Sequence, residues 1–382
     1  MAMPDRAAGP LSDLRVIDAA TVFAGPGAAR YLGDFGADVI KVERPGGGDT
    51  SRSIGWRDRR DGETLWWKLV GRNKRCISLD LKDRSDLEVM RDLCASADVL
   101  VENFRPGTLE RLGLAPEELW ARNPRLVVTR VTGFGQDGPY ASRPGFATQA
   151  EAMSGFAAIS GEPEGQPLLP PIALTDEVAA LAAAFATMVA VHSGVGQVVD
   201  VNLIESMLQL MGPLVSLYGL TGETQERLGA GIPYTVPRNT YRTSDGHWIA
   251  ISTSSAAVAS RMMRLVGLGD VAELESFEGR QDNRERIDEA VAGWISVRPR
   301  AVALEELEAA EVAAAPVHDM ADIFADEHFA ARRAIAEVDG VPMQQLIARL
   351  SATPGSIRWA GRPQDADSAD IRAELADPPR DP

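Results

Sequence analysis

The sequence predicts an α/β protein, in which a Rossmann-like large domain holds a doubly wound, mostly parallel sheet and a smaller α+β domain follows. Short apolar strands alternate with helical segments through residues 14–201, a spacing that is typical of parallel βαβ units. At 382 residues the chain is long enough for two hydrophobic cores. The hydrophobic periodicity breaks at residues 219–237, where glycines and prolines indicate a connection between domains.

Each element of the large domain follows from its local pattern. Short runs rich in Val, Ile and Leu predict strands, and the segments between them are predicted to be helical. Ser85–Glu88 has the spacing of a capping box and places the start of one helix. The predicted strands are residues 14–18, 37–43, 76–81, 99–101, 126–131 and 196–201, and the predicted helices are residues 26–35, 85–95, 116–121, 175–192 and 203–218. Ligands bind such sheets at the C-terminal ends of the strands, so we expect a site in the loops there.

The domain organisation follows from these elements and from composition. We expect residues 1–210 to form the large domain, completed by a return of the chain at about residues 330–360. Residues 211–225 are predicted to be a linker, and residues 226–325 to form the small α+β domain. Residues 361–382 are rich in Asp, Ala and Pro, and this composition predicts a disordered tail.

The charge of the chain limits the classes of ligand. A net charge of −16 and a pI of about 4.8 argue against nonspecific nucleic-acid binding, because that requires a basic surface. A denser set of cations nevertheless occurs before residue 112, and it comprises Arg44, Arg52, Arg57, Arg59, Arg60, Lys68, Arg72, Lys74, Arg75 and Lys82. Such a local basic zone suggests a small polyanionic ligand, and a solvated mixed-charge surface is the alternative.

The sequence predicts a cytoplasmic protein with no membrane partner and no metal. The longest apolar run, 14 residues from 178 to 191, is too short to cross a bilayer and predicts a buried core helix. The first residues lack the apolar core of a signal sequence. Cys76 and Cys94 are too few for a disulfide framework, and no histidine pair lies near them for a zinc site.

Several common motifs are absent or incomplete. Gly25-Pro26-Gly27 follows the first strand as a dinucleotide-binding loop would, but Arg30 stands where a third glycine is needed. Glu43 lies at the right distance to hold a ribose, so a nucleotide-dependent oxidoreductase is one alternative. The chain has no Walker A loop and no G-x-S-x-G elbow, and its four histidines lie at no metal-ligand spacing.

Asp176 is the candidate for covalent chemistry. A loop rich in proline and glycine delivers this single carboxylate to the start of a long apolar helix. The partial positive charge and free N–H groups of a helix N-terminus favour the ionised form of a carboxylate. An ionised carboxylate in an apolar, glycine-lined pocket is a candidate nucleophile. The alternative is that Asp176 only caps its helix.

The loops of this chain resemble those of the family III CoA-transferases, the group that includes formyl-CoA transferase and carnitine CoA-transferase. The matching segments are Val16–Asp18, Ala24–Pro26, Leu32–Glu43, Asn73–Arg75, Leu79–Lys82, Ala97–Gly107, Leu112–Gly113, Thr132–Tyr140, Gly196–Ser206 and Ala315–Val317. The resemblance runs from about residue 12 to about residue 355. Each segment is short, but so many in this order are highly specific.

The resemblance implies that residues 1–210 form a CoA-binding domain. The positions that match the family's CoA contacts are Val22, Ala24, Arg44, Leu79, Lys82, Asn103, Phe104 and Arg111. The three cations among them would face the phosphates of CoA, which agrees with the basic zone before residue 112. A CoA thioester would be a substrate, and no tightly bound cofactor is implied.

The match to Asp176 is the family's nucleophile. The resemblance therefore implies that CoA moves from an acyl-CoA to a carboxylic acid through a covalent aspartyl intermediate. It also implies an interlocked homodimer. The family's glycine loop, which closes over the site, is best matched here by Gly229–Gly231.

Some positions depart from the family pattern. Glu177 follows Asp176 directly and would raise its pKa. Phe23 stands where formyl-CoA transferase has a glutamine, which implies a more apolar acyl pocket. The related 2-methylacyl-CoA racemases use a histidine where this chain has Phe146, so a racemase or isomerase is the disfavoured alternative. A non-catalytic acyl-CoA-binding protein is another alternative, because the residues around Asp176 are altered.

Overall fold

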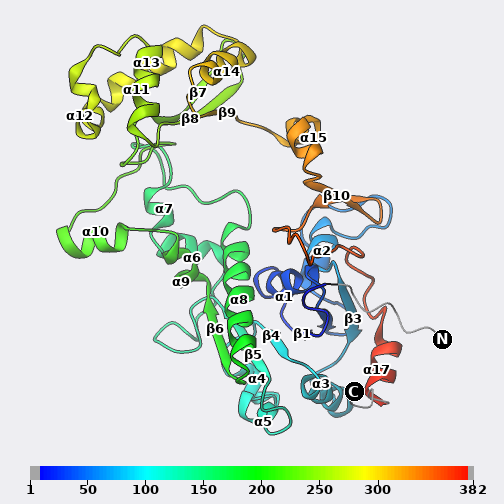
Figure 1. Ribbon diagram of the computed structural model, residues 1–382. Coiled ribbons are helices and arrows are strands. Elements are labelled where there is room, and N and C mark those ends of the chain that lie inside the picture. The colour runs from blue at the N-terminus through cyan, green and yellow to red at the C-terminus, as the bar shows by residue number, and fades with distance from the viewer. Residues whose placement is uncertain (1–8, 377–382) are drawn as a thin grey trace. The chain divides into compact units, whose positions relative to one another are not determined.

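The structure, a computed structural model, describes residues 9–376 and contains two compact units (Figure 1). The first unit consists of Met1–Ser154, Pro170–Gly212 and Arg333–Pro382. The second unit consists of Gly155–Leu169 and Pro213–Arg332. The short segment Gly155–Leu169 thus belongs with the second unit, although it precedes the sequence position at which we expected the small domain to begin.

A six-stranded parallel sheet forms the centre of the first unit, as the sequence predicts. Its strands are β1 (Arg15–Asp18), β2 (Asp38–Glu43), β3 (Lys74–Ser78), β4 (Val99–Glu102), β5 (Val127–Thr132) and β6 (Val198–Asn202). They lie in the order β3-β2-β1-β4-β5-β6. The order reverses between β1 and β4, and such a reversal opens a crevice at the C-terminal ends of these two strands.

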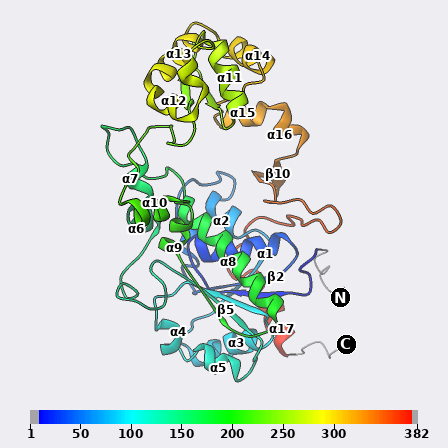
Figure 2. The ribbon, with the colours of Figure 1, turned by 60° about the vertical axis from the view of Figure 1, so that its left-hand side comes forward.

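Helices cover both faces of this sheet (Figure 2). On one face Ile17, Ile40 and Leu100 pack against α3 (Arg84–Ala95), α5 (Pro116–Trp120) and α17 (Ser368–Ala376). On the other face lie α1 (Ala24–Asp34) and α8 (Leu174–Ser193). Because both faces are buried, the strands have nearly continuous apolar sequences rather than alternating ones.

The close approach of α1 to α8 depends on small residues. A Cβ atom added to Gly27 of α1 would lie 2.9 Å from the Cβ atom of Ala180 in α8. The hydroxyl groups of Thr187 in α8 and Thr129 in β5 are 2.6 Å apart and form a buried hydrogen bond. These contacts fix the position of α8 on the sheet, and with it the position of Asp176 in its first turn.

The helix α8 is longer than the apolar run that the sequence analysis considered. By length and composition it could cross a membrane, and α9 (Leu203–Gln209) with α10 (Leu214–Thr221) would pass the same test as one bent span. One side of α8 packs against α1 and the sheet through Ala179, Ala180 and Ala183, which are buried. Its other side exposes Phe185, so the expectation of a buried core helix holds for one face only.

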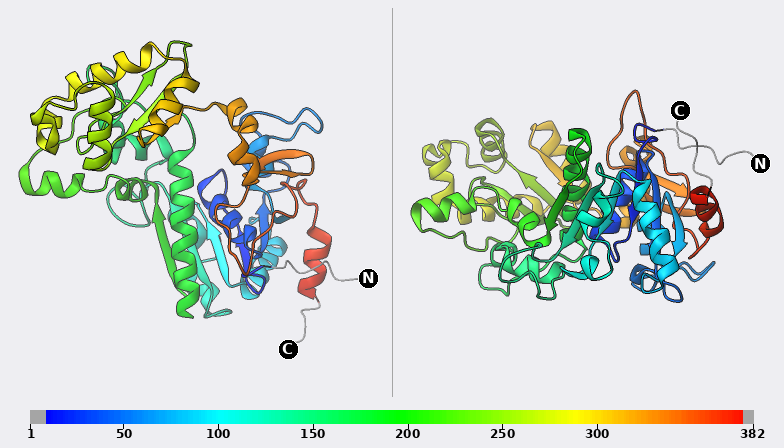
Figure 3. Two further views of the ribbon diagram at one scale, coloured as in Figure 1. Left: turned by 45° about the horizontal axis from the view of Figure 1, so that its top comes forward. Right: turned by 90° about the horizontal axis from the view of Figure 1, so that it is seen from below.

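The C-terminal segment of the chain returns to the first unit. After the hairpin of β10 (Ile335–Val338) and β11 (Val341–Gln344), an extended stretch runs along β3, where the Trp359 indole donates a hydrogen bond to the Lys74 carbonyl. The Asp367 carboxylate accepts a hydrogen bond of 2.8 Å from the Cys76 amide. The helix α17 follows at this edge (Figure 3).

The prediction of a disordered tail from residue 361 is therefore wrong for residues 361–376. The composition of this segment is polar, but its carboxylates satisfy hydrogen-bond donors on β3. Glu374 pairs with Arg75 at 2.7 Å, and Ile371 is buried among the apolar residues of α3. Residues 377–382 lie outside the described part of the chain.

The second unit is built on a three-stranded antiparallel sheet of β7 (Arg238–Arg242), β8 (Trp248–Ser252) and β9 (Ala314–Pro316). One face of this sheet packs against helices through Tyr241, Ile249 and Ile251. The larger helices are α11 (Ala256–Leu265), α12 (Phe277–Asp282), α13 (Arg284–Ser296) and α14 (Arg300–Ala309).

The remaining helical segments of the described chain are Thr50–Arg52, α2 (Leu65–Val70), α4 (Thr108–Arg111), α6 (Ala147–Met153), α7 (Phe156–Ile159), Ala272–Glu275, α15 (Met320–Ala325) and α16 (Glu327–Ala331).

Candidate active site

The loop after β1 is fixed from several sides at the crevice between β1 and β4. The Asn103 side chain, just after β4, accepts a hydrogen bond from the Thr21 amide at 2.8 Å and donates one to the Thr21 carbonyl at 2.7 Å. The Val22 amide donates to the Asp49 carboxylate at 3.1 Å. Val22 has a φ of 72°, a left-handed conformation that a β-branched residue rarely adopts and that persists only where the surroundings enforce it.

A buried group of four charged side chains also stabilises the loop after β1. The Lys74 ammonium pairs with Asp18 at 2.7 Å, and the Lys41 ammonium pairs with Asp49 at 3.0 Å. Lys41 also donates to the Ala20 carbonyl in the loop. Burial raises the pKa of Asp49, but the nearby Lys41 charge and hydrogen bonds from Ser51 outweigh it and lower that pKa overall. These four residues were not recognised as a group from the sequence, although two lysines inside apolar strands were a signal.

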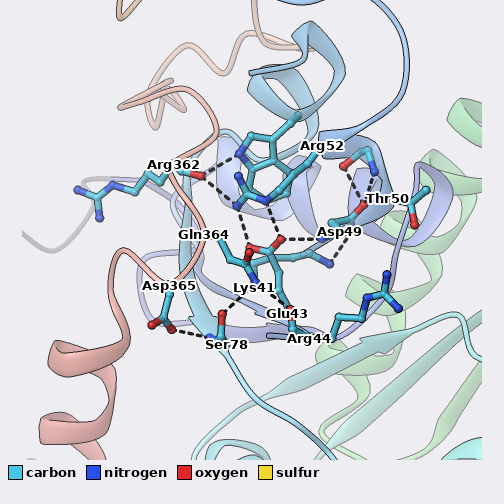
Figure 4. A network of polar contacts seen from close by, with 12 residues as sticks. Lys41, Glu43, Arg44, Asp49, Thr50, Arg52, Ser78, Arg362, Gln364 and Asp365 are labelled. Carbon is cyan, nitrogen blue, oxygen red and sulfur yellow. Dashed lines mark hydrogen bonds and ion pairs between the residues drawn. The ribbon is translucent and has the colours of Figure 1, made fainter. Parts of the chain in front are cut away.

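Glu43, at the end of β2, is fully engaged within the protein (Figure 4). The Arg52 guanidinium donates to both of its carboxylate oxygens at 2.8 Å, and the Asp49 amide donates to one of them at 2.8 Å. The Arg362 carbonyl accepts from Arg52 at 3.1 Å. Glu43 is therefore not placed to hold a ribose, and the oxidoreductase alternative loses the residue on which it depended.

The structure divides the basic zone into paired and unpaired cations. Most of its members pair with carboxylates, and these are Arg52, Arg60, Lys68, Arg72, Lys74 and Arg75. Within residues 9–376, the side chains of Arg44 and Lys82 have no hydrogen bond or ion pair and are exposed. Arg111 is also exposed, and among the described residues its side chain donates only to the Thr108 hydroxyl, at 2.8 Å.

The unpaired cations follow strands that are close together in the sheet. Arg44 comes directly after β2, Lys82 follows β3, and Arg111 ends α4 after β4. All three positions therefore belong to loops or helices at the C-terminal edge of the sheet, where ligands of such folds bind. Six other cations of the basic zone pair with protein carboxylates, whereas Arg57 donates to the Gly62 carbonyl instead.

The remaining predicted CoA contacts are placed differently from one another. Ala24 begins α1 and is buried, whereas Phe104 is half-buried against the core of α3 and α5. Leu79 is 1% exposed within that same core. Its side chain is thus committed to packing and does not line an open groove. The Asn103 side chain is hydrogen-bonded to Thr21, as described above, so it holds the loop after β1 in place.

Asp176 is the third residue of α8 and does not cap it. The cap position is Ala173, which has no side chain that could bond the helix N–H groups. In the described part of the chain the Asp176 carboxylate accepts no hydrogen bond, and it is partly buried. The alternative that Asp176 serves only as a helix cap is therefore wrong.

The environment of Asp176 raises its pKa to about 6, chiefly through burial and then through the charges of Glu151 and Glu177. The helix N-terminus was expected to favour the ionised form, but no N–H group bonds the carboxylate and two other carboxylates repel it, so its pKa is higher than that of an ordinary aspartate. The expectation that Glu177 raises this pKa agrees with the structure.

Two neighbouring helices contribute charged or hydroxyl groups at the start of α8. The Glu177 carboxylate accepts hydrogen bonds from Arg30 at 3.0 Å and from the Tyr31 hydroxyl at 2.7 Å, both on α1. The Thr175 hydroxyl donates to Glu151 of α6 at 2.9 Å. From the sequence, Arg30 was noted only because it replaces the third glycine of a dinucleotide-binding loop. Glu151 was not identified, and it lies 24 residues before its partner Thr175.

The loop Gly229–Gly231 lies in the second unit. Gly229 has a φ of 59°, and its amide donates to the Gly161 carbonyl at 3.0 Å. No cluster of three metal-binding side chains occurs within residues 9–376.

A comparison with protein families identifies the chain. The model of CoA-transferase family III matches residues 11–368. The chain is a family III CoA-transferase. This confirms the resemblance drawn from its loops.

Relatives and solved structures agree with this membership. The chain is 39% identical to succinyl-CoA–D-citramalate CoA-transferase of Chloroflexus aurantiacus, over 92% of this chain and 90% of the relative. It is 41% identical to the beta subunit of succinyl-CoA–L-malate CoA-transferase from the same organism, with the same coverage. A CAIB/BAIF family protein from Brucella suis has a crystal structure that superposes with a TM-score of 0.85 at 32% identity, covering 96% of this chain and all of that one.

The comparison also bears on the alternatives within the superfamily. Both of these relatives are named CoA-transferases, so this CoA-transferase is an enzyme that moves CoA between an acyl-CoA and a carboxylic acid. The racemase alternative lacks its base, because Phe146 stands at the position of the histidine and a phenyl ring cannot accept a proton.

Proposed function

We propose that this CoA-transferase works through a covalent intermediate on Asp176, with succinyl-CoA as donor and a small dicarboxylic acid as acceptor. The observation that carries the proposal is the Asp176 carboxylate itself. It is partly buried in the first turn of α8 and bound by no group of the described chain. A pKa of about 6 leaves it mostly ionised at neutral pH, yet more basic than an ordinary aspartate.

Two acyl-transfer steps place CoA on the enzyme. An Asp176 oxygen attacks the thioester carbonyl, the C–S bond breaks, and the CoA thiolate leaves an acyl–aspartyl anhydride. The thiolate then attacks the Asp176 carboxyl carbon and releases the donor acid as its carboxylate, which forms an aspartyl-CoA thioester. The acceptor carboxylate collects CoA by the reverse sequence. Covalent catalysis of this kind divides one difficult exchange into easier ones.

The same unit provides the groups for the CoA moiety. Within residues 9–376, Arg44, Lys82 and Arg111 form no ion pair with a carboxylate at the C-terminal edge of the sheet, which suits the phosphates of CoA. The loop with Val22 is held by Asn103 and Asp49, so it forms a rigid wall for the ligand at the crevice. Pre-organised binding groups reduce the entropy lost on binding.

The substrate class is inferred from the relatives. Those described above are named for succinyl-CoA as donor and for L-malate or D-citramalate as acceptors. All of these acids are small dicarboxylates, and we propose the same class for this enzyme. Phe23 stacks with Trp66 at a centroid distance of 4.2 Å just before α1, and this pair would form an apolar wall beside the acyl chain.

We also propose that the enzyme is an interlocked homodimer in the cytoplasm. Helix α8 in the first unit exposes Leu181, Phe185 and Val189, which are four residues apart and form one apolar stripe. Helix α10 in the second unit has no buried residue, although it is strongly apolar. Both faces need cover in water. The buried free cysteines suit a reducing compartment.

Intact-protein mass spectrometry tests the covalent mechanism. Wild-type protein mixed with succinyl-CoA is expected to gain a mass that hydroxylamine removes, because anhydrides and thioesters react with this amine. Asp176→Ala is expected to show no adduct while it still binds CoA in a calorimetric titration. An adduct that persists in Asp176→Ala would contradict the assignment of the nucleophile. CoA binding without any wild-type adduct would favour a non-catalytic acyl-CoA-binding protein.

A further inference from the structure

Glu151 is a buried carboxylate that lies against the residue preceding the nucleophile. Its side chain is on α6, it is 4% exposed, and it accepts a hydrogen bond of 2.9 Å from the Thr175 hydroxyl. Thr175 is itself fully buried. Within residues 9–376 no cation lies at ion-pair distance from Glu151, so its charge is not neutralised by a partner. The hydrogen bond that this carboxylate accepts from Thr175 favours its charged form, which burial alone would disfavour.

We propose that Glu151 is a positioning residue for the transfer reaction, whose fixed negative charge shifts Asp176 from its carboxylate toward its covalent, uncharged forms. This inference rests on the proposed function, since it assumes that Asp176 is acylated.

The negative charge of Asp176 passes to a leaving group in each covalent step. As a free carboxylate, Asp176 carries one negative charge beside that of Glu151. When Asp176 attacks the thioester, this charge leaves with the CoA thiolate, and the anhydride at Asp176 is neutral. When the thiolate returns, the charge leaves with the donor acid, and the aspartyl-CoA thioester is again neutral. Repulsion from Glu151 therefore acts only on the free enzyme and favours both covalent states over it.

Protonation removes the same charge from Asp176 as acylation does. The effect of Glu151 can thus be read from the titration of Asp176. Burial raises the pKa of Asp176 first, and Glu151 is the larger of the two charges that raise it further. A variant without this charge is expected to show both a lower pKa at Asp176 and less of the covalent enzyme.

Other charged groups lie on the elements that pack against α8. Arg30 and Tyr31 on α1 bind Glu177, and Arg130 on β5 is paired with Glu102 at 2.6 Å. Asp200 on β6 accepts a hydrogen bond from the Gln136 amide. Glu205 lies in the first turn of α9, and His192 lies in the last turn of α8. The charges that raise the pKa of Asp176 are those of Glu151 and Glu177.

Glu177 provides a matched comparison. It also carries a negative charge next to Asp176, but the Arg30 guanidinium lies 3.0 Å from it and compensates that charge. Glu151 has no such partner among residues 9–376. Removal of the Glu177 charge is therefore expected to affect Asp176 less than removal of the Glu151 charge, although Glu177 is adjacent in sequence.

The test compares Glu151→Gln, Glu151→Asp and Glu177→Gln with the wild type. Glutamine keeps an oxygen that can accept from Thr175 and removes only the charge, whereas aspartate keeps the charge. Two quantities are measured: the acid limb of the pH profile for adduct formation from succinyl-CoA, and the ratio of covalent to free enzyme at equilibrium near pH 8. The titration of Asp176 in the free protein, by carboxyl ¹³C NMR, provides a readout that does not require activity.

Glu151→Gln is expected to move the acid limb down by about one pH unit and to lower the covalent-to-free ratio about tenfold, since one pKa unit corresponds to a factor of ten. Glu151→Asp is expected to keep the wild-type limb, and Glu177→Gln to shift it by less than Glu151→Gln. A Glu151→Gln variant with the wild-type limb and ratio would overturn the proposal. Slower adduct formation at every pH without a displaced limb would also overturn it, because a merely structural role predicts that result.

Two controls keep the outcomes separate. Circular dichroism establishes that each variant folds, and Glu151→Ala replaces the glutamine variant if that one does not. Failure of the proposed function is recognised by a wild-type protein that forms no hydroxylamine-sensitive adduct, and the role of Glu151 then fails with it. Failure of this inference alone leaves the wild-type adduct intact.

Discussion

At the scale of single residues, the ionised carboxylate of Asp176 lowers the stability of the folded protein at neutral pH. Burial and then the charges of Glu151 and Glu177 raise its pKa from 3.8 to about 6. The folded state therefore binds this proton more tightly than the unfolded state. The stabilisation that this bound proton gives the folded state is complete below the pKa of Asp176 in the unfolded chain. It is lost as the pH rises through 6.

Replacement of Asp176 by asparagine is accordingly expected to stabilise the protein near pH 8. The expected increase in the free energy of unfolding is about 2 kcal/mol. This value follows from the raised pKa of Asp176 and is reduced because solvent screens a partly exposed group. Near pH 4 the difference should be small. Urea unfolding followed by tryptophan fluorescence at both pH values checks this, with the exposed Asp13→Asn as control. An asparagine variant that is less stable than the wild type near pH 8 would contradict the raised pKa.

The sequence predicted some residues of the candidate site and could not predict others. Asp176 was proposed from its place at a helix start and from the family resemblance. The unpaired state of Arg44 and Lys82 could not be predicted, because pairing partners such as Glu43 for Arg52 are set by the fold. Glu151 was missed because its contact with Thr175 joins two separate helices. Leu79 was predicted to contact CoA, yet it follows β3 directly and its side chain packs in the core.

At the scale of elements, the strands were predictable where burial on both faces produced unbroken apolar runs. The tail was not, because its order comes from carboxylates that bond β3 rather than from apolar periodicity. The contact between α1 and α8 could not be predicted from the hydrophobic pattern either. The two helices approach closely at Gly27, where there is no side chain to separate them.

Gly27→Ala is expected to destabilise the protein by about 1–3 kcal/mol and to slow adduct formation at Asp176, because overpacking displaces α8. The added Cβ would meet Ala180 at 2.9 Å. Gly293→Ala in α13 is the matched control, since no atom lies within 4 Å of its added Cβ. That control should stabilise the protein by up to about 1 kcal/mol through helix propensity. Equal effects of the two substitutions would show that the α1–α8 contact is not close.

At the scale of the whole molecule, the first unit is completed only when the chain returns to it. The segment from Arg333 onward supplies the hairpin, the stretch along β3 and α17. The Arg362 carbonyl accepts from Arg52, which in turn holds Glu43 near the Val22 loop. The last part of the chain thus contributes to the rigidity of the proposed CoA site as well as to the core.

Deletion of residues 362–382 is therefore expected to reduce both stability and CoA affinity. The deletion removes the Asp367 acceptor from the Cys76 amide, the buried Ile371 and the Arg362 carbonyl. Loss of this apolar burial and of satisfied hydrogen bonds should cost about 3 kcal/mol or more. Thermal unfolding and thiol labelling measure the change. Cys76 is buried, and burial raises its pKa to about 12, so it should react only when β3 is uncovered. Deletion of residues 377–382 alone leaves every described contact in place and should leave Cys76 protected, whereas equal labelling of both deletions would show that the C-terminal return does not cover β3.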